Sequence, residues 1–260
     1  MPIIDCHVHA GDKYGPVENV IAHMDANGVT HAVIVQHMGQ TNNTYLRQCI
    51  DKYPQRFWGI CMVDLTLSNA PKILRSELKE NGLHGVRLPA MSLSRRPDLW
   101  EMAVECKAVI SVLGLQPHDL GQVERLRAFL EKYPTARLKI EHLGYPEPSE
   151  PPPYATYQRV MDLSQFKGVF LQFSSPYTQS KKAYPYDDLL PFIEMAKQHF
   201  APNRIVWGSC YPPVEKYMTY AQSLAWFGTL GLKDTHRDNA LWQNAVRLMD
   251  PRKKKVVAET

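Results

Sequence analysis

Histidines near the start of the chain have a spacing that suits catalysis. Asp5, His7 and His9 alternate with Cys6 and Val8 in an apolar run. Because side chains of a strand alternate between its two faces, Asp5, His7 and His9 are expected on one face. Two imidazoles two residues apart can bind one metal ion or one anionic group of a substrate.

Other reactive side chains occur where later apolar runs end. An arginine late in a strand, between apolar neighbours, can hold a substrate carboxylate with two hydrogen bonds or form an outward salt bridge. Hydroxyl, amide and aromatic groups at such positions can shape a substrate pocket. The candidates are Arg87, Gln116, His118, His142, Tyr154, Ser174, Tyr177 and Cys210.

Eight short apolar runs alternate with helical patterns and would position these residues. Strands are expected at residues 3–9, 31–36, 57–63, 85–89, 109–116, 138–142, 169–173 and 204–208. Helices are expected at 17–27, 41–53, 69–81, 97–107, 120–133, 154–163, 187–199, 216–230 and 238–249. Eight strand–helix units predict an α/β fold, a (β/α)8 TIM barrel, with the site at the C-terminal strand ends. A doubly wound sheet is the alternative, but no G-x-G-x-x-G follows the first run.

Composition and charge limit the class of protein. The 260 residues carry a net charge of +4, and most of it lies in residues 251–260, a basic tail after a single barrel domain at 1–250. The body is nearly neutral, so nucleic acid is not an expected partner. No apolar run is long enough for a membrane helix. Five cysteines without C-x-x-C spacing indicate reduced thiols and a cytoplasmic protein.

Four motifs, in order along the chain, resemble the amidohydrolase superfamily. They are Asp5-x-His7-x-His9, Glu141-His142-Leu143-Gly144, Trp207-Gly208-Ser209-Cys210-Tyr211-Pro212 and Asn244-Ala245-x-Arg247-Leu248. The similar branch holds pyrone dicarboxylate lactonase, sugar-acid lactonases, sulfomuconolactone hydrolase and aminocarboxymuconate semialdehyde decarboxylase. The resemblance covers residues 5–249 and implies a distorted barrel.

Two positions depart from that family's pattern. The aspartate that ends the family's eighth strand, a general base and sometimes a metal ligand, is Cys210 here. The histidine that ends the fifth strand is replaced by Gln116, with His118 two residues further on. If a metal is bound, the resemblance implies Zn²⁺ on His7, His9 and His142. A metal-free site, whose histidines donate hydrogen bonds to substrate, suits the sequence slightly better, so no cofactor is expected to be required.

Cys210 has four interpretations. It can be a nucleophile activated by a lowered pKa, with His142 or His7 as proton carrier. It can be a thiolate that completes a zinc site. It can be a natural or introduced replacement of the aspartate that inactivates the site. It can also be an inert buried thiol.

The resemblance and the site residues together predict hydrolysis of a lactone that carries a carboxylate. His7, His9 and His142 would polarise the ester carbonyl, and Arg87 would orient the carboxylate. The alternatives are a metal-dependent, non-oxidative decarboxylase of an aromatic or muconate-like acid, or a barrel that binds an acid without turnover. The expected partner is a small-molecule acid or lactone, and a homodimer is a possible assembly.

Overall fold

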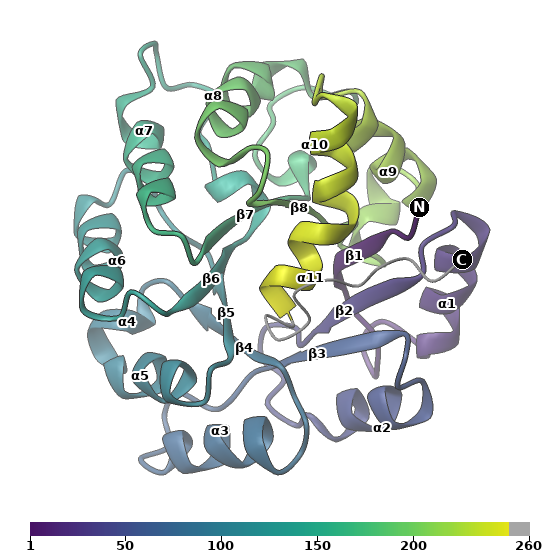
Figure 1. The fold of residues 1–260 in the computed structure, drawn as a ribbon, viewed down its shortest axis with the longest axis vertical. Coiled ribbons are helices and arrows are strands. Elements are labelled where there is room, and N and C mark those ends of the chain that lie inside the picture. Colours follow the sequence, from purple (N-terminus) through teal and green to yellow (C-terminus); the bar gives the residue numbers. More distant parts are fainter. Residues whose placement is uncertain (250–260) are drawn as a thin grey trace.

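A parallel eight-stranded barrel forms the centre of the molecule (Figure 1). The computed structural model describes residues 1–249, and each strand pairs with the next in chain order. This architecture confirms the predicted (β/α)8 barrel in a single domain, whereas the predicted tail at 251–260 lies outside the described residues. The strands are β1 (Ile4–Val8), β2 (His31–Val35), β3 (Phe57–Cys61), β4 (Gly85–Pro89), β5 (Val109–Leu113), β6 (Arg137–Ile140), β7 (Val169–Phe173) and β8 (Ile205–Trp207).

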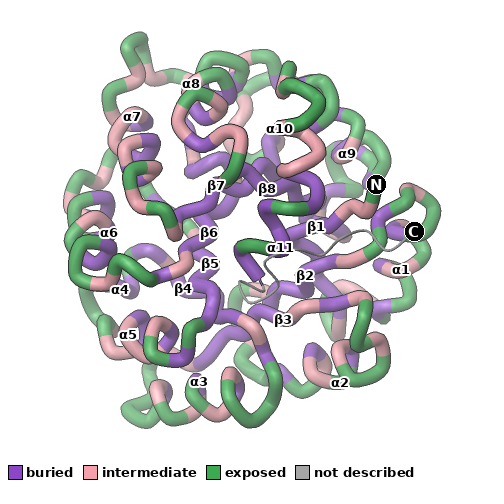
Figure 2. Tube along the Cα trace, in the orientation of Figure 1, coloured by how far each residue is buried: buried purple, intermediate pink, exposed green. Residues whose placement is uncertain are grey.

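Helices surround the strands, with buried faces inward and exposed faces outward (Figure 2). In α6, apolar Val123, Leu126 and Leu130 recur at helical spacing and are buried, and Asp119 caps the first turn by accepting from the N–H of Gln122. None of the helices in residues 1–249 is long and apolar enough to span a bilayer. The α-helices are α1 (Val17–Ala26), α2 (Thr44–Lys52), α3 (Ala70–Lys79), α4 (Ser92–Arg95), α5 (Pro97–Glu105), α6 (Leu120–Lys132), α7 (Ala155–Met161), α8 (Leu190–Phe200), α9 (Tyr220–Gly228), α10 (Asp234–Asp238) and α11 (Asn244–Met249).

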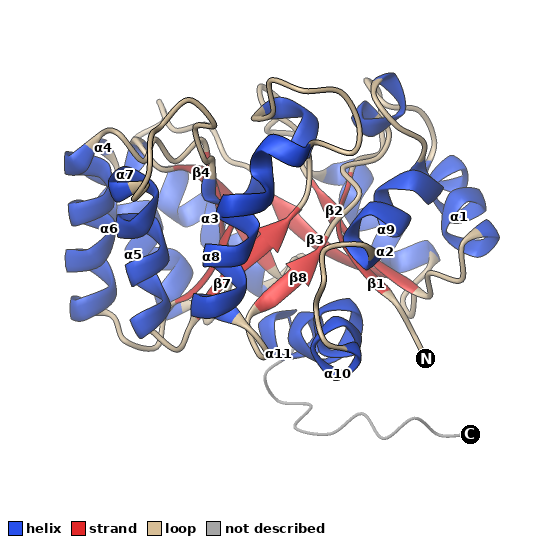
Figure 3. Cartoon of the chain, turned by 90° about the horizontal axis from the view of Figure 1, so that it is seen from above, coloured by secondary structure: helices blue, strands red, loops and turns tan. Residues whose placement is uncertain are grey.

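The last helical segment closes one end of the barrel. Trp242 and Val246 belong to the same buried cluster as Ile4 and Val109, which lie at the starts of their strands. Asn244 donates a hydrogen bond of 2.8 Å to the carbonyl of Ile205, the first residue of β8. Figure 3 shows α10 and α11 on this side, away from the loops at the opposite end. The C-terminal strand ends are therefore the open end of the barrel.

The seam between β1 and β8 is joined by few backbone bonds. His9 N–H donates to the Tyr211 carbonyl and Cys210 N–H donates to the His7 carbonyl, each at 2.8 Å. The pairing of β1 with β2 is irregular between Asp5 and Val8. The seam places the backbone of Cys210 directly beside that of His7.

Candidate active site

His7 and His9 form a buried imidazole pair at the end of β1. Their Nε2 atoms lie 3.2 Å apart, and His9 Nδ1 lies 2.6 Å from the Val35 carbonyl. A carbonyl only accepts, so Nδ1 of His9 carries the hydrogen and its Nε2 presents a lone pair toward Nε2 of His7. The pair is thus locked to β2. Asp5, expected on the same face, instead accepts from Ser209 N–H and Tyr220 OH, each at 2.9 Å, at the β1–β8 seam.

His142 connects three reactive groups from three different strand ends. Its Nδ1 lies 2.9 Å from Ser174 Oγ and 3.8 Å from Cys210 Sγ, and its Nε2 lies 3.5 Å from Glu141 Oε2. Its ring centroid lies 5.4 Å from that of His7. The structure therefore brings His7, His9, His142, Ser174 and Cys210 together at the open end of the barrel.

Arg87 points into the barrel, where it pairs with Glu141. Its Nη2 lies 2.7 Å from Oε2 and its Nε lies 2.9 Å from Oε1, in a two-point contact with both side chains almost fully buried. Ser111 Oγ donates to the same carboxylate at 2.6 Å. Arg87 Nη1 donates to the Gln36 carbonyl. The outward salt bridge considered for Arg87 is wrong, because its partner Glu141 lies inside the barrel.

A cavity of about 330 Å³ opens above these groups. Several elements contribute its walls, and the described lining residues include no aspartate or glutamate. They are His9, Lys13, Tyr14, His37, Met38, Arg87, His142, Ser175, Tyr177, Thr178, Cys210, Pro213, Lys216 and Tyr217. Tyr14 stacks on His9 with ring centroids 5.1 Å apart, and Tyr177 stacks on Tyr217 at 4.2 Å. Such a cavity suits a small anionic molecule with a planar portion.

The three imidazoles are neutral at physiological pH. Burial, followed by the charge of Arg87, lowers the pKa of His9 to about 3. Burial lowers the pKa of His142 to about 4, although Glu141 opposes the shift. Burial and then Lys139 hold the pKa of His7 well below its ordinary value. Burial raises the pKa of Glu141, but Arg87 and His142 outweigh it and bring that pKa to about 2, so Glu141 stays ionised.

The expectation of a lowered pKa for the Cys210 thiol is wrong. Burial raises the pKa of Cys210 to about 12, and contacts with Ser175 only partly oppose the rise. The neighbouring imidazoles are neutral and provide no positive charge, while the charge of Glu141 disfavours a thiolate. The resting group is therefore a thiol.

The arrangement does not fit a bound metal ion. Within residues 1–249, no three histidine, cysteine, aspartate or glutamate side chains are arranged to hold one. Nε2 of His7 and Nε2 of His9 face each other, but Nδ1 of His142 faces Ser174 and Cys210. The suggested zinc set of His7, His9 and His142 is thus a facing pair plus a separate ring that faces other groups.

Three predicted site residues lie away from the cavity walls. β5 ends at Leu113, because Gly114 has φ +63° and turns the chain before Gln116. Gln116 is exposed and bonds to Gln122, and His118 is also exposed. Tyr154 lies at the start of α7, where its ring packs on Phe192 with centroids 4.7 Å apart.

Several residues of the site were not singled out from the sequence. Glu141 binds Arg87 and contacts His142, yet in the sequence it stands out only as part of a motif. Its position directly after β6 is the signal that could have identified it. Lys13 and Tyr14, in the loop after β1, carry no motif. Neither do Lys216 and Tyr217, which follow β8.

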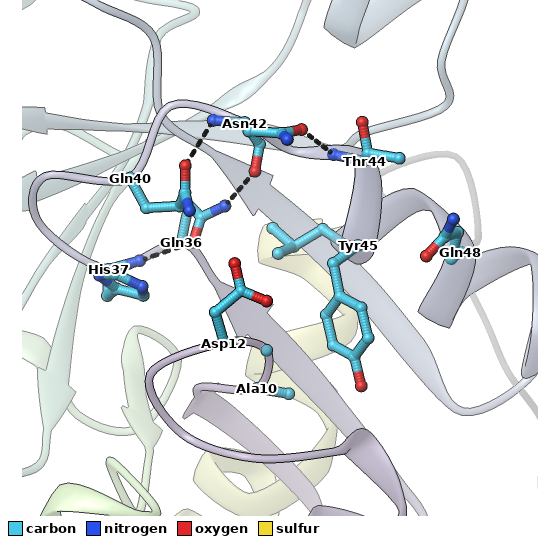
Figure 4. Close-up of a pocket in the computed structure, with 11 residues that line it drawn as sticks. Ala10, Asp12, Gln36, His37, Gln40, Asn42, Thr44, Tyr45 and Gln48 are labelled. Carbon is cyan, nitrogen blue, oxygen red and sulfur yellow. Dashed lines mark hydrogen bonds between the residues drawn. The ribbon is translucent and has the colours of Figure 1, made fainter.

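A second, polar cavity of about 230 Å³ lies beside the first and shares His37 with it (Figure 4). Gln36 donates to the Asn42 carbonyl, and Gln40 accepts from Asn42 N–H, each at 2.9 Å. The side-chain amides of Gln36 and Gln40 are therefore bound to the Asn42 backbone, and the first cavity, which is lined by Cys210 and His142, is the candidate active site.

Comparisons with known proteins agree with this architecture. The amidohydrolase family model matches residues 4–250. The chain is 25% identical to an L-fucono-1,5-lactonase of Burkholderia ambifaria over 77% of this chain and 72% of that protein. It is 25% identical to a 4-sulfomuconolactone hydrolase of Rhizobium radiobacter over 76% of this chain and 66% of that one.

A solved structure shares the fold. The probable 2-pyrone-4,6-dicarboxylic acid hydrolase of Acinetobacter baumannii, crystallised with citric acid bound, superposes with a TM-score of 0.78. The identity is 24%, and the alignment covers 96% of this chain and 99% of that one. The family match over nearly the whole chain, together with the barrel and its histidine-rich open end, shows that this chain belongs to the amidohydrolase family, as an enzyme of the hydrolase type.

Proposed function

We propose that the chain hydrolyses a carboxylate-bearing lactone, with Cys210 as nucleophile. The proposal rests on the arrangement of Cys210, His142 and Glu141 beside the cavity. Sγ of Cys210 lies 3.8 Å from Nδ1 of His142, and Nε2 of His142 lies 3.5 Å from Oε2 of Glu141. A nucleophile, a base and a carboxylate that orients the base can act in acyl transfer. The two curated relatives named above are both lactone-cleaving enzymes by name.

In the first step, Cys210 Sγ attacks the lactone carbonyl carbon. The thiol proton moves to Nδ1 of His142, and Glu141 stabilises the imidazolium that forms. Because the thiol pKa is about 12 and the His142 pKa about 4, this transfer is far uphill in the resting enzyme. The proton must therefore leave as the carbon–sulfur bond forms.

In the second step, the ring carbon–oxygen bond breaks. The departing alkoxide takes the proton from His142, which leaves a thioester on Cys210 and a free hydroxyl at the other end of the opened ring. Water then attacks the thioester carbonyl and gives a proton to His142. The sulfur leaves with that proton, so a hydroxy acid is released and the thiol is restored.

One further residue, Arg87, supports the substrate. The bonds of Arg87 to Glu141 and to the Gln36 carbonyl use three of the five guanidinium N–H groups. Arg87 also lines the cavity, so it keeps donors for a substrate oxygen. The single N–H of neutral His9 is already donated to the Val35 carbonyl, so we assign the substrate carbonyl oxygen to the remaining N–H groups of Arg87.

A second candidate function is an acid-binding barrel without turnover. It is favoured by the absence of a carboxylate base among the described residues that line the cavity. In that case the position of Cys210 is that of a lost catalytic aspartate. Metal-dependent decarboxylation lacks comparable support, because the donor atoms do not form a metal-binding set.

The test is a panel of five- and six-membered lactones, with and without a carboxylate, followed by base consumption at constant pH. Intact-protein mass spectrometry after rapid acid quenching should detect a thioester whose mass equals protein plus lactone. Cys210→Ala should abolish the adduct, and exposed His118→Gln should leave turnover unchanged. Hydrolysis of no lactone in the panel, with binding of the hydroxy acids intact, would establish the second candidate instead.

A further inference from the structure

Two exposed lysines stand at the mouth of the cavity, and we infer that Lys13 and Lys216 bind the anionic group of the substrate. This inference rests on the proposed function and says which residues recognise the negative charge of the substrate. These two residues at the rim, and not Arg87 inside the barrel, are then the main binding site for the anionic group.

The balance of charge in the cavity leads to this assignment. Lys13, Arg87 and Lys216 are the full cations among the described lining residues, and none of those residues carries a carboxylate. Arg87 is neutralised by Glu141 at 2.7 Å. Neither lysine forms an ion pair with any residue in 1–249. The unbalanced positive charge of the cavity is therefore at its mouth, where it attracts an anion.

A closed loop holds Lys13 in place. Gly11 N–H donates to the Gly15 carbonyl and Gly15 N–H donates to the Gly11 carbonyl, each at 2.8 Å. Both glycines have positive φ, +112° and +80°, which other residues rarely adopt. Lys13 Nζ lies 5.3 Å from the centroid of the Tyr14 ring, and that ring stacks on His9. The backbone of this loop therefore fixes where Lys13 leaves the chain, close to a residue of the reacting centre.

Lys216 is held in a comparable way from the other side of the β1–β8 seam. It ends the short helix Pro213–Lys216, in which Val214 N–H donates to the Cys210 carbonyl at 3.2 Å. The next residue, Tyr217, stacks on Tyr177 with an angle of 10° between the rings. Because β1 and β8 are neighbours, the segments that carry both lysines start from one side of the barrel. If both lysines bind the anionic group of a substrate, the lactone ester of that substrate lies toward Cys210.

The test replaces each lysine by glutamine, which removes the charge and keeps most of the stem. With a carboxylate-bearing lactone, Lys13→Gln and Lys216→Gln should each raise KM about 10-fold, the scale of one charge-assisted hydrogen bond. kcat should change little, because neither group touches the ester. Lys→Arg at the same positions should restore most of the affinity. The matched control is Lys182→Gln, which removes an exposed lysine of the β7–α8 loop that does not line the cavity.

A neutral probe and salt provide independent readouts. The primary amide of the same lactone should show the same KM in wild type and in the double variant. Raising NaCl from about 0.05 to about 0.5 M should weaken the binding of the acid by wild type and not by the double variant, because exposed charges are screened.

Two outcomes would overturn the inference while leaving the proposed function intact. One is an unchanged KM for the acid in the double variant, and the other is an equal rise in KM for the amide. If no lactone is hydrolysed, the proposed function fails, and calorimetric titration of the ring-opened hydroxy acid becomes the readout. A loss of binding in Lys13→Gln and Lys216→Gln then supports the charge assignment, and equal binding refutes it.

Discussion

The Sγ atom of Cys210 lies 3.8 Å from Nδ1 of His142, and the same nitrogen lies 2.9 Å from Ser174 Oγ. Two potential nucleophiles thus share one base. Cys210 lines the cavity with His142, whereas Ser174 is absent from the described lining residues and 1% exposed. Access to substrate therefore favours the thiol and makes Ser174 the group that orients the imidazole.

Exchange of the residue at position 210 separates a nucleophile from a lost general base. If the thiol attacks, Cys210→Ser should lower kcat about 100-fold or more, because an alcohol is a poorer nucleophile than a thiol near neutral pH. Cys210→Asp should then give no gain. A rise of about 100-fold or more in Cys210→Asp, the contribution of a restored general base, would remove the nucleophile hypothesis. The measurement is kcat on the best lactone of the panel.

The buried ion pair of Arg87 and Glu141 should be important for stability. Arg87→Gln leaves the Glu141 carboxylate buried without its cation, which should cost about 3–5 kcal/mol of unfolding free energy. Urea denaturation followed by circular dichroism measures this cost. The control is Arg75→Gln, which breaks an exposed pair with Glu105 and should cost far less. Equal losses in the two variants would mean that the interior pair contributes no more than a surface one.

Acid should destabilise the fold through the neutral imidazoles. The folded-state pKa of His142 is about 4, below its ordinary value of 6.5, so the unfolded chain binds more protons between these values. This contribution is complete above pH 6.5 and is lost as the pH falls toward 4, with a magnitude of about 3 kcal/mol. His9, with a pKa of about 3, acts in the same direction.

Asp5 opposes this trend, because burial raises its pKa to about 6 and the folded state gains stability as the pH falls from 6 toward 4. Three lowered histidines outweigh one raised carboxyl. Urea midpoints at pH 7.5, 6.0 and 5.0 should therefore fall steadily. His142→Asn should flatten the profile, while exposed His118→Gln should leave its slope unchanged. A flat wild-type profile would contradict the burial of neutral histidines.

Chelation should have no effect on the chain. Because the described donors do not form a set that can hold a metal ion, dialysis against EDTA should leave both turnover and melting temperature unchanged. Plasma emission spectrometry of the purified protein should find less than one zinc per chain. Stoichiometric zinc, lost together with activity on dialysis and restored by added zinc, would refute this expectation.

Much of the fold could be predicted from local patterns. The residue ranges of β4 and β7 match the expectation, because these strands are short apolar runs bounded by turn residues. One boundary matters for the site: the expected end of β5, at residue 116, lies three residues beyond its actual end at Leu113. Gly114, which has a positive φ, ends the strand. Because the apolar Leu115 follows it, the apolar run in the sequence continues past the turn.

The sequence by itself determined which strand ends carry His7, His9, His142 and Cys210, because parallel barrel strands bring their C-terminal ends together whatever their separation along the chain. Only the tertiary structure decided what these groups can do. The partner of Arg87, Glu141, is 54 residues away on the chain, and the side chains of β4 and of the residue that follows β6 meet only once the barrel closes. The protonation of Cys210 and His142 depends on burial among neutral neighbours, a property of packed atoms that no spacing of residue types records.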